Sequence, residues 1–372
     1  MGRTCFDKDF LKKSFSSDQI SFVSGKSEIR VSNRFYDAKV DTKTGQILSL
    51  KDKRTKNFHR EIVKQPLNQL IIHDDVPFFW DNWDIMHHAY ETKVKKVQDN
   101  LTNYKVIIDD ARSVCLRFEF KISEKSKMTQ DIIFYNYSAK IDFKTNVDWY
   151  ESRKLLKAYF PVNIRTDYAT FDISSGLLRR PIHTNTSWDQ ARLEVCGHKF
   201  VDLSESRFGV SLLNDCKYGY TVRDQTIGLS LLKAGEFPWE KTDKKNHEFI
   251  YSLLCHDKPL ADSNVFDEAY KLNTPLWAAI VEKPELDVPE GLEGTKLVSP
   301  ISEVPPLSYF ELIDTPNCVL TAFKRSERDA QKYVARLAEV RGEEAMAILS
   351  FNQDLFNFSQ VKVCTGLENE LD

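Results

Sequence analysis

The segment Ser113–Ser123, with the sequence SVCLRFEFKIS, alternates apolar and polar side chains without interruption. Every second position carries an apolar side chain: Val114, Leu116, Phe118, Phe120 and Ile122. The positions between them carry Cys115, Arg117, Glu119 and Lys121. Because successive side chains of a strand point to opposite faces, this pattern predicts a β-strand with one buried and one solvated face.

The same period recurs along the chain. In residues 139–147, AKIDFKTNV, the pattern predicts Ala139, Ile141 and Phe143 inward and Lys140, Asp142 and Lys144 outward. Residues 34–53 read as a hairpin that turns at Thr42–Gly45, and residues 209–232 read as three short strands. No βαβ rhythm and no repeat is visible. We therefore predict an all-β protein, with a large antiparallel β-sandwich (a supersandwich) followed by a smaller C-terminal β-sandwich.

Helical signals are few, and the best is residues 261–275, where Asp262 or Ser263 could cap a short helix before Pro275. Residues 284–306 contain five of the 13 prolines and two glycines. Such a stretch cannot hold a central strand and reads as a linker. The predicted organisation is a lead-in at 1–26, a large β-domain at 27–283, the linker at 284–306 and a small, possibly truncated β-domain at 307–372.

Composition and charge exclude several classes of protein. A net charge of -3 and 29% charged residues over 372 positions give no reason to expect a nucleic acid or a membrane as partner. No run of 18 apolar residues and no apolar signal-peptide region is present. The seven cysteines are scattered and form no C-x-x-C pair, which indicates reduced thiols in a cytosolic-type compartment.

Two clusters join tryptophan to aspartate. Residues 78–93, FFWDNWDIMHHAYETK, contain Trp80-Asp81 and Trp83-Asp84, and a third pair is Trp188-Asp189. Indole faces beside carboxylates suit a carbohydrate surface. The alternative is that the tryptophans pack between sheets while the aspartates cap turns. Physics alone favours the alternative, so we expect Trp188→Ala to cost about 3–5 kcal/mol of stability.

Histidine and cysteine spacings do not predict a catalytic metal centre. His87 and His88 are adjacent, so on a strand they would point to opposite faces. Cys196 and His198 would share a face, with Cys216 nearby, but a small buried thiol beside a hydrogen-bonded histidine is the favoured interpretation. We assign no catalytic residue and no metal ligand.

Three long segments carry a family resemblance. They are His183–Tyr220, which begins HTNTSWDQARLEVCGHKF, Pro77–Lys93, and Cys318–Ala345. In their order along the chain, these segments resemble the C-terminal β-region of glycoside hydrolase family 38, the α-mannosidases, and most closely its cytosolic and vacuolar branch. The likeness extends from about Ser27 onward.

The resemblance implies an enzyme that removes terminal α-linked mannose, with retention, in oligosaccharide catabolism. In the family, zinc and a carboxylate nucleophile belong to an N-terminal catalytic barrel, and the His-x-Asp-x-x-Trp zinc motif has no counterpart here. The resemblance therefore implies no cofactor in this chain and zinc in the N-terminal catalytic domain. We expect the chain to be an inactive fragment or half of a split enzyme, located in the cytoplasm or reaching the vacuole by a non-secretory route.

The expected partners are that catalytic domain and a mannose-containing oligosaccharide, and homo-oligomerisation is possible. The alternative is a stand-alone carbohydrate-binding or assembly module without hydrolase activity. The residues that we place at a substrate entrance or a domain interface are Trp80, Asp81, Trp83, Asp84, Trp188 and Asp189.

Overall fold

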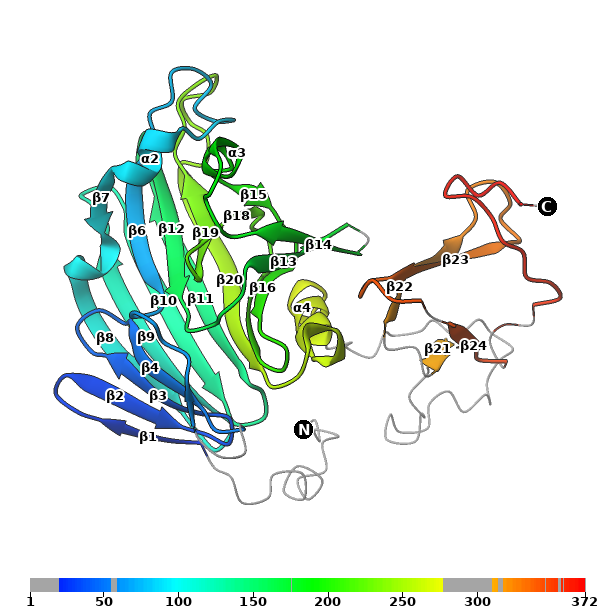
Figure 1. Ribbon diagram of the computed structural model, residues 1–372, viewed down its shortest axis with the longest axis horizontal. Helices are drawn as coiled ribbons and strands as arrows, with labels where there is room; N and C mark the ends of the chain where they lie inside the picture. Colours follow the sequence, from blue (N-terminus) through cyan, green and yellow to red (C-terminus); the bar gives the residue numbers. More distant parts are fainter. Residues whose placement is uncertain are drawn as a thin grey trace, which may run out of the picture. The chain divides into compact units, whose positions relative to one another are not determined.

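The computed structural model of the protein describes residues 20–54, 59–174, 176–276, 310–313, 317–344, 346–353, 356 and 358–371. The chain divides into two compact units, Ser17–Pro275 and a second unit that holds the described residues from Leu276 onward. Figure 1 draws the strands of the first unit in blue to yellow-green and those of the second in orange to red. Both units are built from antiparallel strands, which confirms the predicted all-β class.

The largest sheet contains nine strands. They are β8 (Leu101–Asp109), β9 (Ser113–Lys121), β10 (Lys127–Tyr135), β11 (Lys140–Trp149), β13 (Tyr168–Ile173), β14 (Gly176–Pro181), β16 (Phe200–Ser204), β17 (Gly209–Asn214) and β20 (Lys245–His256). Their order across the sheet is β14-β13-β16-β17-β20-β11-β10-β9-β8. The long strand β20 pairs with β11 on one side and with β17 on the other, so it joins the two halves of the sheet.

A second sheet of six strands packs against the first. Its strands are β6 (Gln69–Asp74), β7 (Lys93–Lys96), β12 (Lys154–Pro161), β15 (Val195–Cys196), β18 (Gly219–Arg223) and β19 (Thr226–Lys233), in the order β15-β18-β19-β12-β6-β7. The ring of Phe160 on β12 lies 5.4 Å from Phe143 on β11 and 6.0 Å from Tyr251 on β20. These fully buried rings form the core between the two faces of a sandwich.

The third sheet has five strands in chain order: β1 (Ser21–Ser24), β2 (Glu28–Ser32), β3 (Tyr36–Asp41), β4 (Ile47–Asp52) and β5 (Arg60–Glu61). The predicted turn at Thr42–Gly45 connects β3 to β4, which confirms the hairpin. Gly45 has a φ of 68° there, and a Cβ at this position would lie 3.0 Å from the Phe118 ring. Both facts explain why the turn carries glycine.

The strand that the opening segment predicts is β9, and its apolar set is buried as expected. Cys115, predicted on the solvated face, is buried as well, since a thiol packs as a small apolar group. Residues 139–147 differ in one respect. Asp142 on β11, predicted to face solvent, is buried, because its carboxylate accepts hydrogen bonds from the hydroxyls of Ser252 (2.6 Å) and Tyr135 (2.8 Å) on the neighbouring strands. Hydroxyl partners allow a carboxylate to occupy a position that the alternation assigns to solvent.

Helices are short and lie between strands. They are α2 (His87–Glu91), η1 (Val97–Asn100), α3 (Ser187–Ala191), η2 (Leu260–Asp262) and α4 (Val265–Asn273). The last confirms the predicted helix. The Ser263 hydroxyl accepts a hydrogen bond from the amide of Val265 at 3.3 Å, although the N-cap residue itself is Asn264. Among the described residues, no helix is both long and apolar enough to cross a membrane.

The described part of the second unit contains β21 (Phe310–Ile313), β22 (Cys318–Arg325), β23 (Tyr333–Glu339) and β24 (Ile348–Phe351). They pair as β21 with β24 and β22 with β23, both antiparallel. The ring of Phe323 on β22 lies 5.3 Å from Phe310 and 5.8 Å from Phe351, so an aromatic cluster connects the two pairs. The predicted linker at 284–306, like most of the lead-in at 1–26, lies outside the described residues. The domain boundaries therefore stay predictions.

Candidate functional site

The first tryptophan–aspartate cluster forms an exposed loop between β6 and α2. Trp80 and Trp83 stack with ring centroids 4.9 Å apart and planes inclined by 13°. Trp83 is 71% exposed, and its neighbours Phe78 and Phe79 are also exposed. These aromatic side chains therefore lie on the surface, as a binding or docking role requires, and not between the sheets.

A second aromatic loop, between β19 and β20, lies against the first. Phe237 and Trp239 are exposed, and the Phe237 ring lies 5.1 Å from that of Trp80. The backbone amide of Asn82 donates to the carbonyl of Phe237 (3.2 Å), and its side-chain amide donates to the carbonyl of Trp239 (3.3 Å). Figure 1 shows the two loops side by side beyond the ends of their strands. We name residues 78–84 and 236–239 the aromatic loop pair.

Asp81 fastens the two loops together. Its buried carboxylate accepts hydrogen bonds from the backbone amides of Glu236 (3.0 Å) and Phe237 (2.6 Å), and Arg153 Nε lies 3.8 Å from it. Asp84 is exposed and accepts from the amide of Ile85 at 2.9 Å. Both aspartates thus shape the loop that presents the tryptophans.

A buried ion pair lies at the base of this loop. Asp75 is fully buried, and the Lys233 ammonium lies 3.2 Å from its carboxylate while also donating to the carbonyl of Asp84. Burial raises the pKa of Asp75 to about 6, although Lys233 opposes the shift. Because Lys233 contacts both Asp75 and the loop backbone, the pair ties the aromatic loop to the end of the sheet.

The second cluster differs from the first. Trp188 lies on α3 and is 85% exposed, so the expectation that it packs between sheets is wrong. The expectation for the aspartate is correct in kind: Asp189 completes a capping box in which it accepts from the Thr186 amide (3.1 Å) and hydroxyl (2.8 Å). α3 is about one turn long, and Thr186 and Asp189 hydrogen-bond to each other at its start. The helix therefore has no apolar face that would draw the Trp188 indole into the core.

Replacing Trp188 by alanine should change the free energy of unfolding by no more than about 0.5 kcal/mol. The indole is 85% exposed, so the substitution deletes a side chain that faces solvent and leaves no cavity in the core. Denaturant unfolding followed by circular dichroism measures the effect. A loss above about 2 kcal/mol would show that the indole is covered in solution.

The thiols and histidines do not form a metal centre in the described part of the chain, where no group of three His, Cys, Asp or Glu side chains is placed to hold an ion. Cys196 and Cys216 are exposed free thiols, so the expectation of a buried thiol is wrong. His87 and His88 lie on a helix and not on a strand, and His87 pairs with Glu91 one turn on, at 3.0 Å. Short loop-bound elements, which periodicity cannot detect, account for both differences.

Sequence reasoning missed the second loop of the pair, with Phe237 and Trp239. The available signal was FPWEKTD, in which two aromatic residues flank Pro238 and charged residues follow, without the alternation of a strand. It also missed Lys233 and Asp75, because only the pairing of β6 with β12 and of β12 with β19 brings their strand ends together.

Two family descriptions match the sequence of the chain. The Glycosyl hydrolases family 38 C-terminal domain matches residues 31–241, and the Glycosyl hydrolases family 38 C-terminal beta sandwich domain matches residues 317–372. The first match spans more than half of the chain, and the second falls in the smaller unit.

Curated relatives and solved structures agree with these matches. The chain is 38% identical to "Alpha-mannosidase 2C1" of Homo sapiens over 277 residues, which is 74% of this chain and 25% of that protein. It is 33% identical to "Alpha-mannosidase G" of Dictyostelium discoideum over 351 residues, which is 92% of this chain and 30% of that protein. The chain thus spans less than a third of the length of these relatives.

An alpha-mannosidase from Enterococcus faecalis V583 has a similar fold. Its crystal structure aligns with a TM-score of 0.71 at 16% identity, covering 94% of this chain and 40% of the other. At this identity the likeness concerns the fold.

Proposed function

The chain belongs to glycoside hydrolase family 38, as part of its C-terminal region, and on that premise we propose that it supports the catalytic domain of an α-mannosidase. The complete enzyme would hydrolyse terminal α-linked mannose of oligosaccharides. The relatives that share 33–38% identity carry the name alpha-mannosidase and are about three times as long as this chain, which leaves room for such a domain.

The observation that carries the proposal is the exposed aromatic loop pair. Phe78, Phe79, Trp83 and Trp239 are each more than 60% exposed on two adjacent loops. Large apolar side chains exposed on adjacent loops, where the Trp80 ring contacts both Trp83 and Phe237, favour an interaction surface. The loops are held by Asp81 and Asn82, so little conformational entropy is lost when a partner covers them.

The division of chemistry follows from the residues at hand. We propose that the zinc ligands, nucleophile and general acid lie outside this chain, because its family matches cover only C-terminal domains of family 38. Zinc and the carboxylate nucleophile would belong to the catalytic domain. The role proposed for the aromatic loop pair is to complete the interface with that domain at the edge of the substrate entrance.

Replacing both Trp83 and Trp239 by serine should weaken binding to a family 38 catalytic domain by at least about 30-fold. A tryptophan that is an interface hot spot contributes about 2 kcal/mol or more, and 1.4 kcal/mol corresponds to a factor of ten. The lower bound of about 30-fold therefore requires only one of the two tryptophans to be a hot spot. Sedimentation of the chain with the catalytic domain measures the affinity, and hydrolysis of an aryl α-mannoside by the mixture measures the consequence.

The sequence grouped Trp188 with the interface residues, but the proposed interface is the aromatic loop pair, and Trp188 lies outside it on α3. Trp188→Ser, which removes another exposed tryptophan, is therefore the matched control. It should leave both the affinity and the hydrolysis unchanged. A chain that sediments as a monomer and ignores the catalytic domain would contradict the proposal, and self-association that the loop variants abolish would indicate a homo-oligomer instead.

One observation favours a second candidate, a stand-alone carbohydrate-binding module. The stacked indoles of Trp80 and Trp83 present an aromatic face on which sugar CH groups can pack. Calorimetric titration of the chain alone with a mannose oligosaccharide distinguishes the two. Binding that is lost in Trp83→Ser without any catalytic domain would support this second function.

We also propose a cytoplasmic location, or a vacuolar one reached without secretion. The six cysteines of the described residues are all free thiols, as in a reducing compartment. Microscopy of the tagged full-length protein, with a secreted marker beside it, tests the location.

A further inference from the structure

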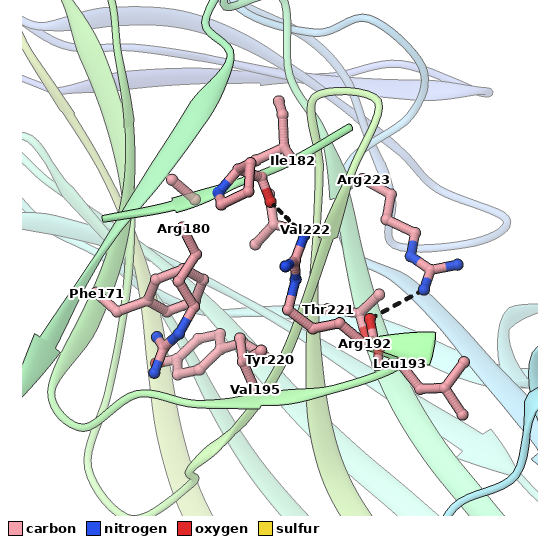
Figure 2. A pocket seen from close by; sticks show the side chains of 12 residues that line it. Phe171, Arg180, Ile182, Arg192, Leu193, Val195, Tyr220, Thr221, Val222 and Arg223 are labelled. Atoms are coloured by element: carbon pink, nitrogen blue, oxygen red, sulfur yellow. Dashed lines mark hydrogen bonds between the residues drawn. The ribbon is translucent and has the colours of Figure 1, made fainter. Parts of the chain in front are cut away.

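A pocket lined by three arginines lies between the end of the nine-stranded sheet and the edge of the six-stranded sheet (Figure 2). Strands β13, β14 and β18 and the segment after α3 supply its walls: Ala169, Phe171, Arg180, Pro181, Ile182, Arg192, Leu193, Val195, Tyr220, Thr221, Val222 and Arg223. No aspartate or glutamate is among these residues. The cavity is about 20 Å³, enough for one water-sized group, and it opens to solvent.

Two of the arginines are fixed by one nitrogen each. Arg192 Nη2 donates to the carbonyl of Pro181 (3.1 Å) and to the carboxylate of Asp189 (3.0 Å). Arg223 Nη2 donates to the carbonyls of Gln190 (3.1 Å) and Arg192 (3.0 Å), and Figure 2 marks the contacts to Pro181 and Arg192. A guanidinium has five N–H donors, so each fork is oriented while donors remain for a ligand.

Arg180 is the unsatisfied member. Its Nη1 atom is buried without a hydrogen-bond partner in the described structure, and its Cζ lies 4.5 Å from the centre of the Phe171 ring. Burial lowers the pKa of Arg180, and the positive charge of Arg192 lowers it further. The Arg180 side chain is half-buried, and its Nη1 atom is a buried donor that an oxygen of a bound anion can satisfy.

The charges around the pocket leave a positive excess. Asp189 pairs with Arg192, and its carboxylate is also occupied by Thr186. In the part of the chain that the structure describes, no carboxylate lies within salt-bridge distance of Arg180 or Arg223. An anion of compact shape would neutralise this excess and satisfy the buried Arg180 donor, and guanidinium forks match the oxygens of phosphate and carboxylate.

We propose that this pocket binds a small tetrahedral oxyanion, phosphate or sulfate, with one oxygen in the cavity against Arg180 and the rest at the open mouth. Figure 2 shows the guanidinium groups of Arg192 and Arg223 turned away from that of Arg180, so they contribute positive charge to the pocket from its other side. This site is separate from the aromatic loop pair and does not depend on the proposed hydrolase role. The open mouth admits either a free anion or a phosphate that is part of a larger molecule.

The test is the thermal unfolding of the full chain at constant ionic strength with phosphate, sulfate, acetate or chloride. At a phosphate concentration about ten times Kd, the midpoint should rise by roughly 3–6 °C relative to chloride. Arg180→Gln should reduce this rise to below about 1 °C, since it removes the buried fork. Arg180→Lys, which keeps the charge without the fork, should retain an intermediate rise.

The matched control is Arg179→Gln, because Arg179 is the exposed neighbour on the same strand and stacks on Tyr168 instead. It should keep the full response. Phosphate and sulfate also stabilise proteins by exclusion from their surface, so equal rises in wild type, Arg179→Gln and Arg180→Gln would overturn the proposal. Calorimetric titration with phosphate provides a second readout, and no heat of binding in wild type would overturn it as well.

A further arm compares inorganic phosphate with glycerol phosphate. Tighter binding of the free anion identifies free phosphate as the ligand type, and tighter binding of the ester indicates a phosphorylated molecule. Loss of either response in Arg180→Gln supports the site.

Discussion

Replacing Trp149 by alanine should lower the free energy of unfolding of the large unit by about 3–5 kcal/mol. Trp149 is fully buried at the end of β11, and its Nε1 donates a hydrogen bond to the carbonyl of Lys233 at 3.1 Å. The substitution removes an indole from the core between the two sheets and leaves that carbonyl without its donor. Lys233 is also the residue whose side chain contacts the first loop of the aromatic loop pair, so the loops should loosen as well.

Denaturant unfolding followed by far-ultraviolet circular dichroism measures this effect without relying on tryptophan fluorescence. Trp188→Ala is the matched control, because it removes the same side chain from an 85% exposed position. Trp149→Phe should fall between wild type and Trp149→Ala, since it keeps most of the apolar volume. Equal stability of the two alanine variants would contradict the placement of both tryptophans.

Trp149 is buried and Trp188 is exposed, and the sequence pattern around each tryptophan accounts for the difference. Trp149 continues the two-residue period that runs through Ile141, Phe143 and Val147, so the alternation itself predicts its burial. Trp188 follows the polar residues of a capping box and belongs to no period. The prediction that Trp188 is a core residue relied on the size and apolar character of tryptophan alone. The residues around Trp188 instead favoured the start of a surface helix.

The strands and turns follow from short-range pattern, but the order of the strands does not. β20 lies between β11 and β17, and its pairing with β11 joins residues about a hundred positions apart, as Lys140 with Leu254. Nothing local specifies that register. The buried Asp142 has the same origin, because its partners come from two different neighbouring strands. Long-range pairing decides such positions.

The candidate site was half predictable for the same reason. The pattern FFWDNWD identified Trp80 and Trp83, whereas Phe237 lies beside them only because the carboxylate of Asp81 binds amides about 155 residues further on. The arginines of the pocket belong to no sequence motif at all. Arg180, Arg192 and Arg223 come from separate strands and a loop, and no spacing in the sequence relates them.

A second large effect is expected at the buried pair of Lys157 on β12 and Glu194. The Lys157 ammonium is fully buried, 3.6 Å from the Glu194 carboxylate and 2.9 Å from the Thr221 hydroxyl. Replacing Glu194 by leucine removes the carboxylate but keeps a buried cation, which should cost about 3–5 kcal/mol of stability. The double variant Lys157→Met/Glu194→Leu replaces both charges by apolar side chains of similar volume and should recover most of that loss.

The pH dependence separates loss of the charge pair from simple loss of packing. Burial lowers the pKa of Lys157 in the native protein, and Glu194 opposes that shift. In Glu194→Leu the opposing charge is gone, so the folded-state pKa should fall further while the unfolded chain keeps the ordinary value of about 10.4. Below that value the unfolded state then binds more protons than the folded state, and stability rises with pH.

The deficit of Glu194→Leu relative to wild type should therefore be smaller at about pH 9.5 than at about pH 7, as measured by urea unfolding at both values. The double variant has no lysine at this position, so its difference from wild type should lack this recovery. A deficit in Glu194→Leu that stays constant with pH would show that the lost free energy comes from packing and not from the charge left on Lys157.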